Sequence, residues 1–159
     1  MIEIKNIAKS FGGLKAVDNI SATIGEGHVF GLIGTNGAGK STLLRLVCGV
    51  LKADSGSVTV DGDEVYDNPA AKAKLFYISD EQYFYKNGTP RDMLRLYQAF
   101  YPRFDGGKWG ILTEKFGLDI NRKINTFSKG MKKQLSVICG VCAGTKYLVC
   151  DETFDGLDP

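Results

Sequence analysis

The chain has 159 residues, of which 43% are hydrophobic and 24% are charged, and its formal net charge is +2. This length suffices for one domain with a buried core, and so small a charge gives no electrostatic case for binding nucleic acid or a membrane surface. No stretch approaches the roughly 18 apolar residues of a membrane span, and residues 1–5 lack the apolar centre of a signal peptide. We therefore expect a cytosolic protein.

Residues 1–24 predict a small antiparallel sheet. Ile2 and Ile4 alternate with charged residues, and the Gly-rich residues 12–13 and 25–27 are typical of turns. The apolar residues 28–33 then predict a buried strand. A further strand with its turn is expected over residues 57–63, and strands over residues 75–79 and 147–150.

A glycine-rich loop follows the segment 28–33. Residues 34–41 read Gly-Thr-Asn-Gly-Ala-Gly-Lys-Ser and fit the phosphate-binding P-loop pattern G-x-x-x-x-G-K-[ST]. Glycines let backbone N–H groups approach a phosphate, Lys40 can reach the outer phosphates as a point charge, and the Ser41 hydroxyl can ligate Mg²⁺. The predicted nucleotide-binding residues here are Gly34, Thr35, Asn36, Gly37, Ala38, Gly39, Lys40, Ser41 and Thr42.

The flanks of this loop support the motif. Residues 40–51 predict a helix, because Leu43, Leu46, Val47, Val50 and Leu51 fall on one face. A strand, a glycine loop and a helix are the context that a P-loop requires. The N-terminus of such a helix also offers N–H groups and a favourable dipole to an anion.

The second half of the chain predicts helices before its last strand. Residues 91–116 carry apolar side chains at helical spacing, and Pro102 and Gly106–Gly107 divide them into two helices. Residues 129–143 predict another helix, with Ser128 as its N-cap. Residues 91–116 are therefore interpreted as a helical insertion in an α/β core.

The cysteines favour a structural role. Cys139 and Cys142 have C-x-x-C spacing, but a zinc site needs two more ligands and the only histidine, His28, is distant in sequence. We therefore expect these two, with Cys48 and Cys150, to be reduced core residues.

An acidic pair follows the last predicted strand. Two adjacent carboxylates repel each other, so their placement side by side after a strand suggests a functional role. With a P-loop upstream, Asp151 can hold Mg²⁺ opposite Ser41. Glu152 is then placed to orient or deprotonate an attacking water. The predicted catalytic residues are Lys40, Asp151 and Glu152.

These motifs resemble those of ATP-binding cassette (ABC) ATPases, over essentially all of the chain. Residues 34–41 are similar to Walker A, residues 147–151 to Walker B, Glu152 to the catalytic glutamate and residues 155–158 to the D-loop. The resemblance implies an α/β P-loop NTPase of ABC type, having a mixed sheet, an N-terminal antiparallel β-subdomain and a helical insertion. The implied division is 1–85 for the β-subdomain and P-loop core, 86–128 for the helical insertion, and 129–159 for the signature helix, Walker B and D-loop.

The resemblance also implies residues that contact the nucleotide. Phe11 falls where the family stacks an aromatic ring on adenine, and Val17 is similar to the apolar residue on the other side of the base. Ser128 and Gly130 match the family signature that binds the γ-phosphate held by an opposite subunit. Lys129 replaces a glycine of that signature, and this variant resembles ATPases of bacterial antibiotic- or lantibiotic-resistance exporters.

Two features depart from the family pattern. Asp80 aligns with the glutamine of the Q-loop, where a carboxylate suits Mg²⁺ or its nucleophilic water. The family continues beyond the D-loop with another core strand and a switch histidine, which this sequence lacks. We therefore expect a C-terminally truncated chain whose parent is an ATPase, while the chain itself binds nucleotide weakly and turns it over poorly.

The sequence thus predicts an ATPase that binds ATP and Mg²⁺ and powers an ABC transporter, favouring export. Its permease would be a separate membrane protein, its partner a second ATPase subunit in a homodimer or heterodimer, and its location the inner face of the cell membrane. Alternatives are a soluble ABC-type ATPase, a P-loop kinase or GTPase, and a non-catalytic nucleotide-binding fragment. A kinase is disfavoured by the acidic pair Asp151–Glu152 followed by residues 155–158.

Overall fold

The structure is a computed structural model that describes residues 1–152. The chain divides into two compact units, Met1–Leu75 and Phe76–Pro159.

A four-stranded antiparallel sheet, in the order β2-β1-β3-β4, dominates the first unit. Ile2 at the start of β1 pairs with Ile24 of β2 on one side and with Val60 of β3 on the other. This confirms the predicted antiparallel sheet. Its strands are β1 (Ile2–Phe11), β2 (Leu14–Ile24), β3 (Ser55–Val60) and β4 (Asp63–Glu64).

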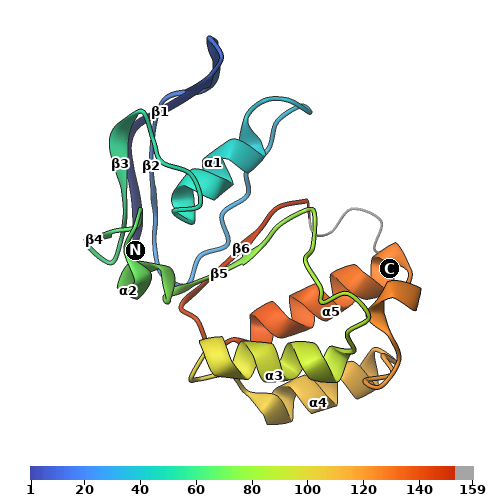
Figure 1. The fold of residues 1–159 in the computed structure, drawn as a ribbon. Helices are drawn as coiled ribbons and strands as arrows, with labels where there is room; N and C mark the ends of the chain where they lie inside the picture. Colours follow the sequence, from blue (N-terminus) through green and yellow to red (C-terminus); the bar gives the residue numbers. More distant parts are fainter. Residues whose placement is uncertain (153–159) are drawn as a thin grey trace. The chain divides into compact units, whose positions relative to one another are not determined.

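Helix α1 (Lys40–Val47) packs on this sheet and closes the core of the first unit (Figure 1). The alternation of β1 puts Ile2 and Ile4 in that core, where Leu46 and Val47 of α1 are also buried. The short helix α2 (Pro69–Lys72) begins at Asn68, whose side chain accepts hydrogen bonds from two backbone N–H groups of its first turn.

The strand expected over residues 28–33 is absent. These residues have no regular structure and belong to neither sheet of the described chain. Val29 and Ile33 are almost fully exposed, at 103% and 97%. A strand is stable only when a neighbouring strand takes its backbone hydrogen bonds, so apolar composition alone did not suffice here.

Helix α1 also ends earlier than predicted. It stops at Val47 because Gly49 adopts a left-handed conformation with φ 63°. The N–H groups of Val50 and Leu51 both donate to the Arg45 carbonyl, which closes the helix end. Val50, expected on the buried face, is consequently 58% exposed.

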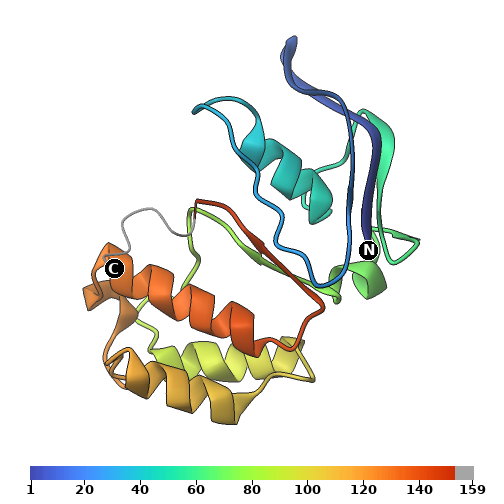
Figure 2. The same ribbon diagram turned by 180° about the vertical axis from the view of Figure 1, so that it is seen from behind.

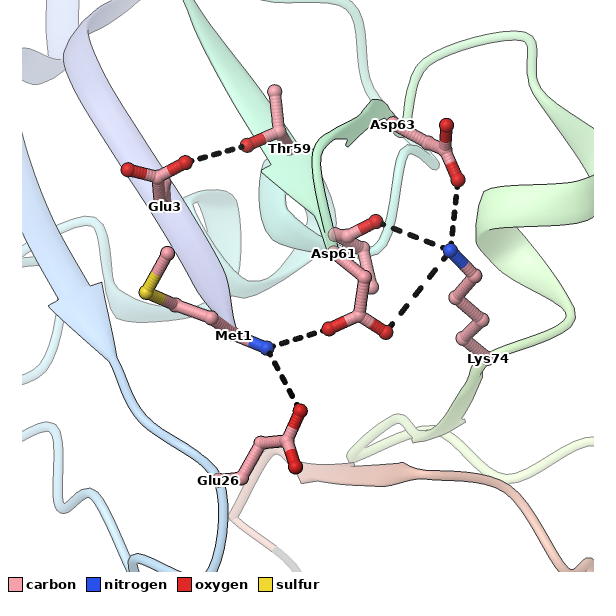
Figure 3. Close-up of polar contacts among 8 residues, drawn as sticks. Met1, Glu3, Glu26, Thr59, Asp61, Asp63 and Lys74 are labelled. Carbon is pink, nitrogen blue, oxygen red and sulfur yellow. Dashed lines mark hydrogen bonds and ion pairs between the residues drawn. The ribbon is translucent and has the colours of Figure 1, made fainter.

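Ion pairs tie the chain start to the turn between β3 and β4 (Figure 3). The Met1 ammonium lies 2.6 Å from Asp61 Oδ1, and Lys74 Nζ lies 2.7 Å from Asp63 Oδ2. Thr59 Oγ1 donates to Glu3 Oε2 across the β1–β3 pair at 3.4 Å. The hydrogen bond between Thr59 and Glu3 supports the register of β1 and β3. The exposed ion pairs add only a little to the stability of this pairing.

The second unit pairs β5 (Leu75–Ile78) in parallel with β6 (Tyr147–Cys150) and adds three longer helices. These helices lie side by side in both views (Figures 1 and 2). They are α3 (Pro90–Phe100), α4 (Gly106–Lys115) and α5 (Lys129–Cys142), with the 3₁₀ turn η1 (Ile124–Thr126) before α5. The helices expected over residues 91–116 and 129–143, and the strand expected over residues 147–150, are thus confirmed.

One boundary inside the helical insertion differs from the prediction. Gly106 and Gly107 do not separate the helices but form the first turn of α4. Asp105 is the reason, because its Oδ1 accepts the Lys108 N–H at 2.8 Å and caps the helix.

The core of the second unit holds two of the cysteines. Cys139 and Cys142 are buried beside Phe76, Trp109 and Leu135, which confirms that they are core residues. Burial raises the pKa of the Cys139 thiol to about 12, so the thiol stays protonated at neutral pH. Among the described residues, no helix combines the length and apolarity needed to cross a membrane.

Candidate nucleotide-binding site

The P-loop is an open turn leading into α1. Residues 34–38 are exposed, and the Ala38 N–H donates to the Thr35 carbonyl at 3.2 Å. Gly37 and Gly39 have φ values of 81° and 85°, which residues other than glycine rarely adopt. The two conformations turn the loop back on itself, as a nest of backbone N–H groups requires.

Gly39 is also constrained by its neighbour in β2. A Cβ on Gly39 would lie 2.0 Å from the Ala16 carbonyl oxygen, far inside any allowed contact. Val17 lies next to the same point, with its Cγ2 3.9 Å from that Cβ position. The absence of a side chain therefore lets α1 begin directly against β2.

Lys40 places its ammonium inside the loop. Its Nζ donates to the carbonyl oxygens of Gly34 and Thr35, each at 3.0 Å. Gly39 offers no side-chain cap, and the start of a helix directs its backbone N–H groups outward along the helix axis. A cation and several N–H donors gathered at one helix N-terminus favour a phosphate anion. The P-loop residues therefore fit a nucleoside triphosphate.

Phe11 and Val17 occupy different environments in the first unit. Phe11 ends β1 and is 48% exposed, and Lys9 Nζ lies 5.5 Å from its ring centroid. Lys9 is held there by Asp54, 2.6 Å away. Val17 is only 5% exposed, so it also serves core packing. Stacking of a base on Phe11 and a contact with Val17 stay predictions.

Asp151 lies directly after β6 in the second unit. Its side chain is only 2% exposed, and Tyr77 Oη donates to its Oδ2 at 3.1 Å. The Asp151 N–H donates to the Ile78 carbonyl at 2.9 Å, extending the β5–β6 pairing by one residue. Strand pairing and the tyrosine together fix this carboxylate, and such an oxygen donor fits Mg²⁺.

Glu152 is exposed and has an uncommon backbone. Its φ is 47°, in the left-handed region that a residue with a Cβ enters at a cost. Its carbonyl oxygen accepts a hydrogen bond of 2.7 Å from Lys133 Nζ. The carboxylate is therefore accessible to water while the main chain is held from α5.

The signature residues begin α5 as expected. Ser128 caps the helix, because its Oγ accepts the Met131 N–H at 3.1 Å. Lys129 is exposed and Gly130 half-buried in the first turn. Asp80 is exposed in the loop after β5. The predicted D-loop, residues 155–158, lies outside the described residues.

Sequence reasoning missed two residues of this region, Tyr77 and Lys133. Tyr77 was interpreted only as part of an apolar strand, although its hydroxyl contacts Asp151. Lys133 has no role in the sequence prediction, yet it is only 1% exposed. One sequence signal could have indicated the burial of Lys133. It lies seven residues before Gly140 and therefore on the same face of the predicted helix.

A glycine loop that opens a helix in the first unit is typical of an α/β P-loop nucleotide-binding protein. Consistent with this, the family model described as "ABC transporter" matches residues 17–155. The chain belongs to the ABC transporter family.

The relatives agree with this assignment. "ABC transporter ATP-binding protein YtrB" of Bacillus subtilis (strain 168) is 34% identical over 158 residues, covering 99% of this chain and 54% of YtrB. "Lantibiotic transport ATP-binding protein SrtF" of Streptococcus pyogenes is 32% identical, covering 100% of this chain and 69% of SrtF.

A solved structure described as the ATP binding subunit of an ABC transporter superposes with a TM-score of 0.90 at 25% identity, covering 100% of this chain and 69% of that one. The expected α/β fold of ABC type is thus confirmed. The chain spans about half the length of the first curated relatives that it matches.

Proposed function

We propose that this chain is the ATP-binding part of a subunit that hydrolyses ATP to drive an ABC transporter. The observation that carries the proposal is the P-loop, where Lys40 Nζ and the start of α1 present positive charge in an open glycine turn. The family and the matched ATP-binding proteins support the same function.

Each site residue has a proposed role. The residues 34–42 bind the phosphates, with Lys40 neutralising their charge and Ser41 ligating Mg²⁺. Asp151 supplies the Walker B carboxylate for the metal, and Asp80 is a further candidate for contact with it. Mg²⁺ would supply charge neutralisation at the transferring phosphoryl group. Glu152, exposed beside this carboxylate, orients or deprotonates the attacking water.

The assembly that we propose has two ATPase subunits and a separate permease. Phe11 and Val17 contact the adenine, whereas Ser128 and Gly130 face the γ-phosphate of nucleotide bound to the opposite subunit. The subunit works at the inner face of the cell membrane, and export is the proposed direction. SrtF, a lantibiotic transport protein by its name, supports a role in transport.

Two substitutions in the protein as encoded by its gene test this function. We expect Lys40→Ala to weaken ATP binding at least tenfold, because it removes the ammonium that binds the phosphates. We expect Glu152→Gln to retain ATP binding but lower kcat about 10²–10⁴-fold, the usual contribution of a general base. Fluorescent-nucleotide titration and phosphate release measure the two effects.

Lys86→Ala, which removes an exposed lysine, is the matched control for loss of one charge. It should leave both measurements unchanged. Full ATP affinity in Lys40→Ala, or full kcat in Glu152→Gln, would contradict the proposed roles.

A further inference from the structure

Lys133 is a charged residue in an apolar place. It lies in the second turn of α5 and is 1% exposed over its whole side chain. A lysine that merely covers apolar surface with its stem keeps its ammonium in water, which this burial excludes. A buried ammonium needs hydrogen-bond acceptors to offset its lost hydration, and the Glu152 carbonyl is one of them at 2.7 Å.

The geometry of α5 directs Lys133 toward the end of β6. Lys133, Ser136 and Gly140 are spaced i, i+3 and i+7 and therefore share one face of the helix. A Cβ on Gly140 would lie 2.8 Å from Leu148 Cδ1 and 3.1 Å from Ile78 Cδ1, so this face packs on β5 and β6. Two turns nearer the N-terminus, Lys133 reaches the residue that follows Asp151.

The bond from Lys133 ends on a strained residue. Glu152 has a φ of 47°, a conformation that persists only when the surroundings impose it. Lys133 Nζ fixes the direction of the Glu152 carbonyl, and the peptide planes on either side of the Cα determine where the side chain leaves the backbone.

From this geometry, and resting on the function proposed above for Glu152, we propose that Lys133 is a positioning residue for the catalytic carboxylate. It acts through the main chain and not by touching substrate. Loss of its ammonium releases the left-handed conformation of Glu152 and turns the carboxylate away from the attacking water.

The experiment uses the protein as encoded and five variants, one of them a control. Lys133→Met keeps the length and apolar body of the side chain but removes the donor. Lys133→Gln shortens it but keeps an N–H donor. Glu152→Gln and the double variant Lys133→Met/Glu152→Gln test whether one residue acts through the other. Lys132→Met, at the half-buried neighbour, is the matched control.

We expect Lys133→Met to lower kcat at least tenfold with less than a twofold change in MgATP affinity. Lys133→Gln should retain part of that rate, and Lys132→Met all of it. In the Glu152→Gln background, adding Lys133→Met should change the residual rate less than twofold, because the group that Lys133 positions is already gone.

A wild-type kcat in Lys133→Met would overturn the proposal, and so would an undiminished loss in the Glu152→Gln background, which marks a general structural role. If Lys133→Met does not fold, Lys133→Gln decides by the same rate comparison, alone and with Glu152→Gln. If Glu152→Gln leaves kcat unchanged, that result contradicts the function proposed for Glu152 and not the role of Lys133.

A second measurement does not depend on activity. The Cα and Cβ chemical shifts of Glu152, read by NMR, report whether its backbone is left-handed. We expect them to leave the left-handed range in Lys133→Met and to stay in it in Lys132→Met. Unchanged Glu152 shifts in Lys133→Met would refute the proposal even if the protein hydrolysed no ATP.

Discussion

Gly39 shows how one residue couples the P-loop to the sheet behind it. Its conformation, φ 85°, and the nearness of the Ala16 carbonyl both exclude a side chain. The motif in the sequence explains the glycine by the phosphate that it approaches. The structure adds a second reason, which is the packing of α1 against β2.

This double constraint gives a prediction at the residue scale. Gly39→Ala should lower the free energy of unfolding by more than about 3 kcal/mol, because a contact at 2.0 Å adds to the left-handed strain. Gly62, with φ 86° and nothing within 4 Å of its Cβ position, is the matched control. Gly62→Ala should cost only about 1–2 kcal/mol. Urea unfolding measures both, and equal losses would show that the Ala16 contact does not matter.

Sequence patterns predicted some residues of the candidate site but not others. Lys40, Ser41 and Asp151 were predicted from short local patterns, and their roles at a nucleotide stay predictions. Tyr77 and Lys133 were not, since each contacts a partner distant in sequence, 74 residues away for Tyr77–Asp151. Such a pairing becomes visible only after β5, β6 and α5 have packed.

Helix α5 was the element best predicted, because its signals are local. Ser128 provides the cap, and the apolar residues Leu135, Ile138 and Cys139 follow at helical spacing and are buried. Residues 28–33 were the element predicted wrongly. Their composition favours a strand, but a strand exists only with a partner, and neither described sheet includes them.

The packing of α5 gives a prediction at the element scale. Gly140→Ala should lower the free energy of unfolding by about 1 kcal/mol, since crowding against Leu148 and Ile78 outweighs the gain in helix propensity. Gly110 in α4 has nothing within 4 Å of its Cβ position. Gly110→Ala should therefore raise stability by about 0.5–1 kcal/mol. Thermal and urea unfolding compare the two variants, and stabilisation of both would contradict the proposed contact of α5 with β5 and β6.

At the scale of the whole molecule, Lys129 concerns the proposed assembly of two subunits. A cation in the first turn of α5 opposes the helix dipole, costing the free chain about 0.3–1 kcal/mol. Its benefit is expected only when the phosphate held by an opposite subunit approaches. Removal of the Lys129 charge should therefore stabilise the free subunit and destabilise the ATP-driven dimer.

We expect Lys129→Ala to keep or slightly raise the melting temperature of the nucleotide-free protein and to weaken its ATP-driven dimer. The difference in dimer affinity from wild type should shrink at high salt, because ions screen the added charge. Sedimentation with ATP at low and high salt measures this. An ATP-driven dimer whose strength and salt dependence are unchanged would refute the role of Lys129.

The sequence by itself determined the family of this protein and the residues proposed to carry its chemistry. The P-loop, the acidic pair and the helix caps are short patterns in which adjacent residues suffice, because each acts through the local backbone. Tertiary structure alone decided that residues 28–33 form no strand and that Lys133 is buried against the Glu152 carbonyl. Burial and strand pairing depend on partners far along the chain, and no local pattern specifies them.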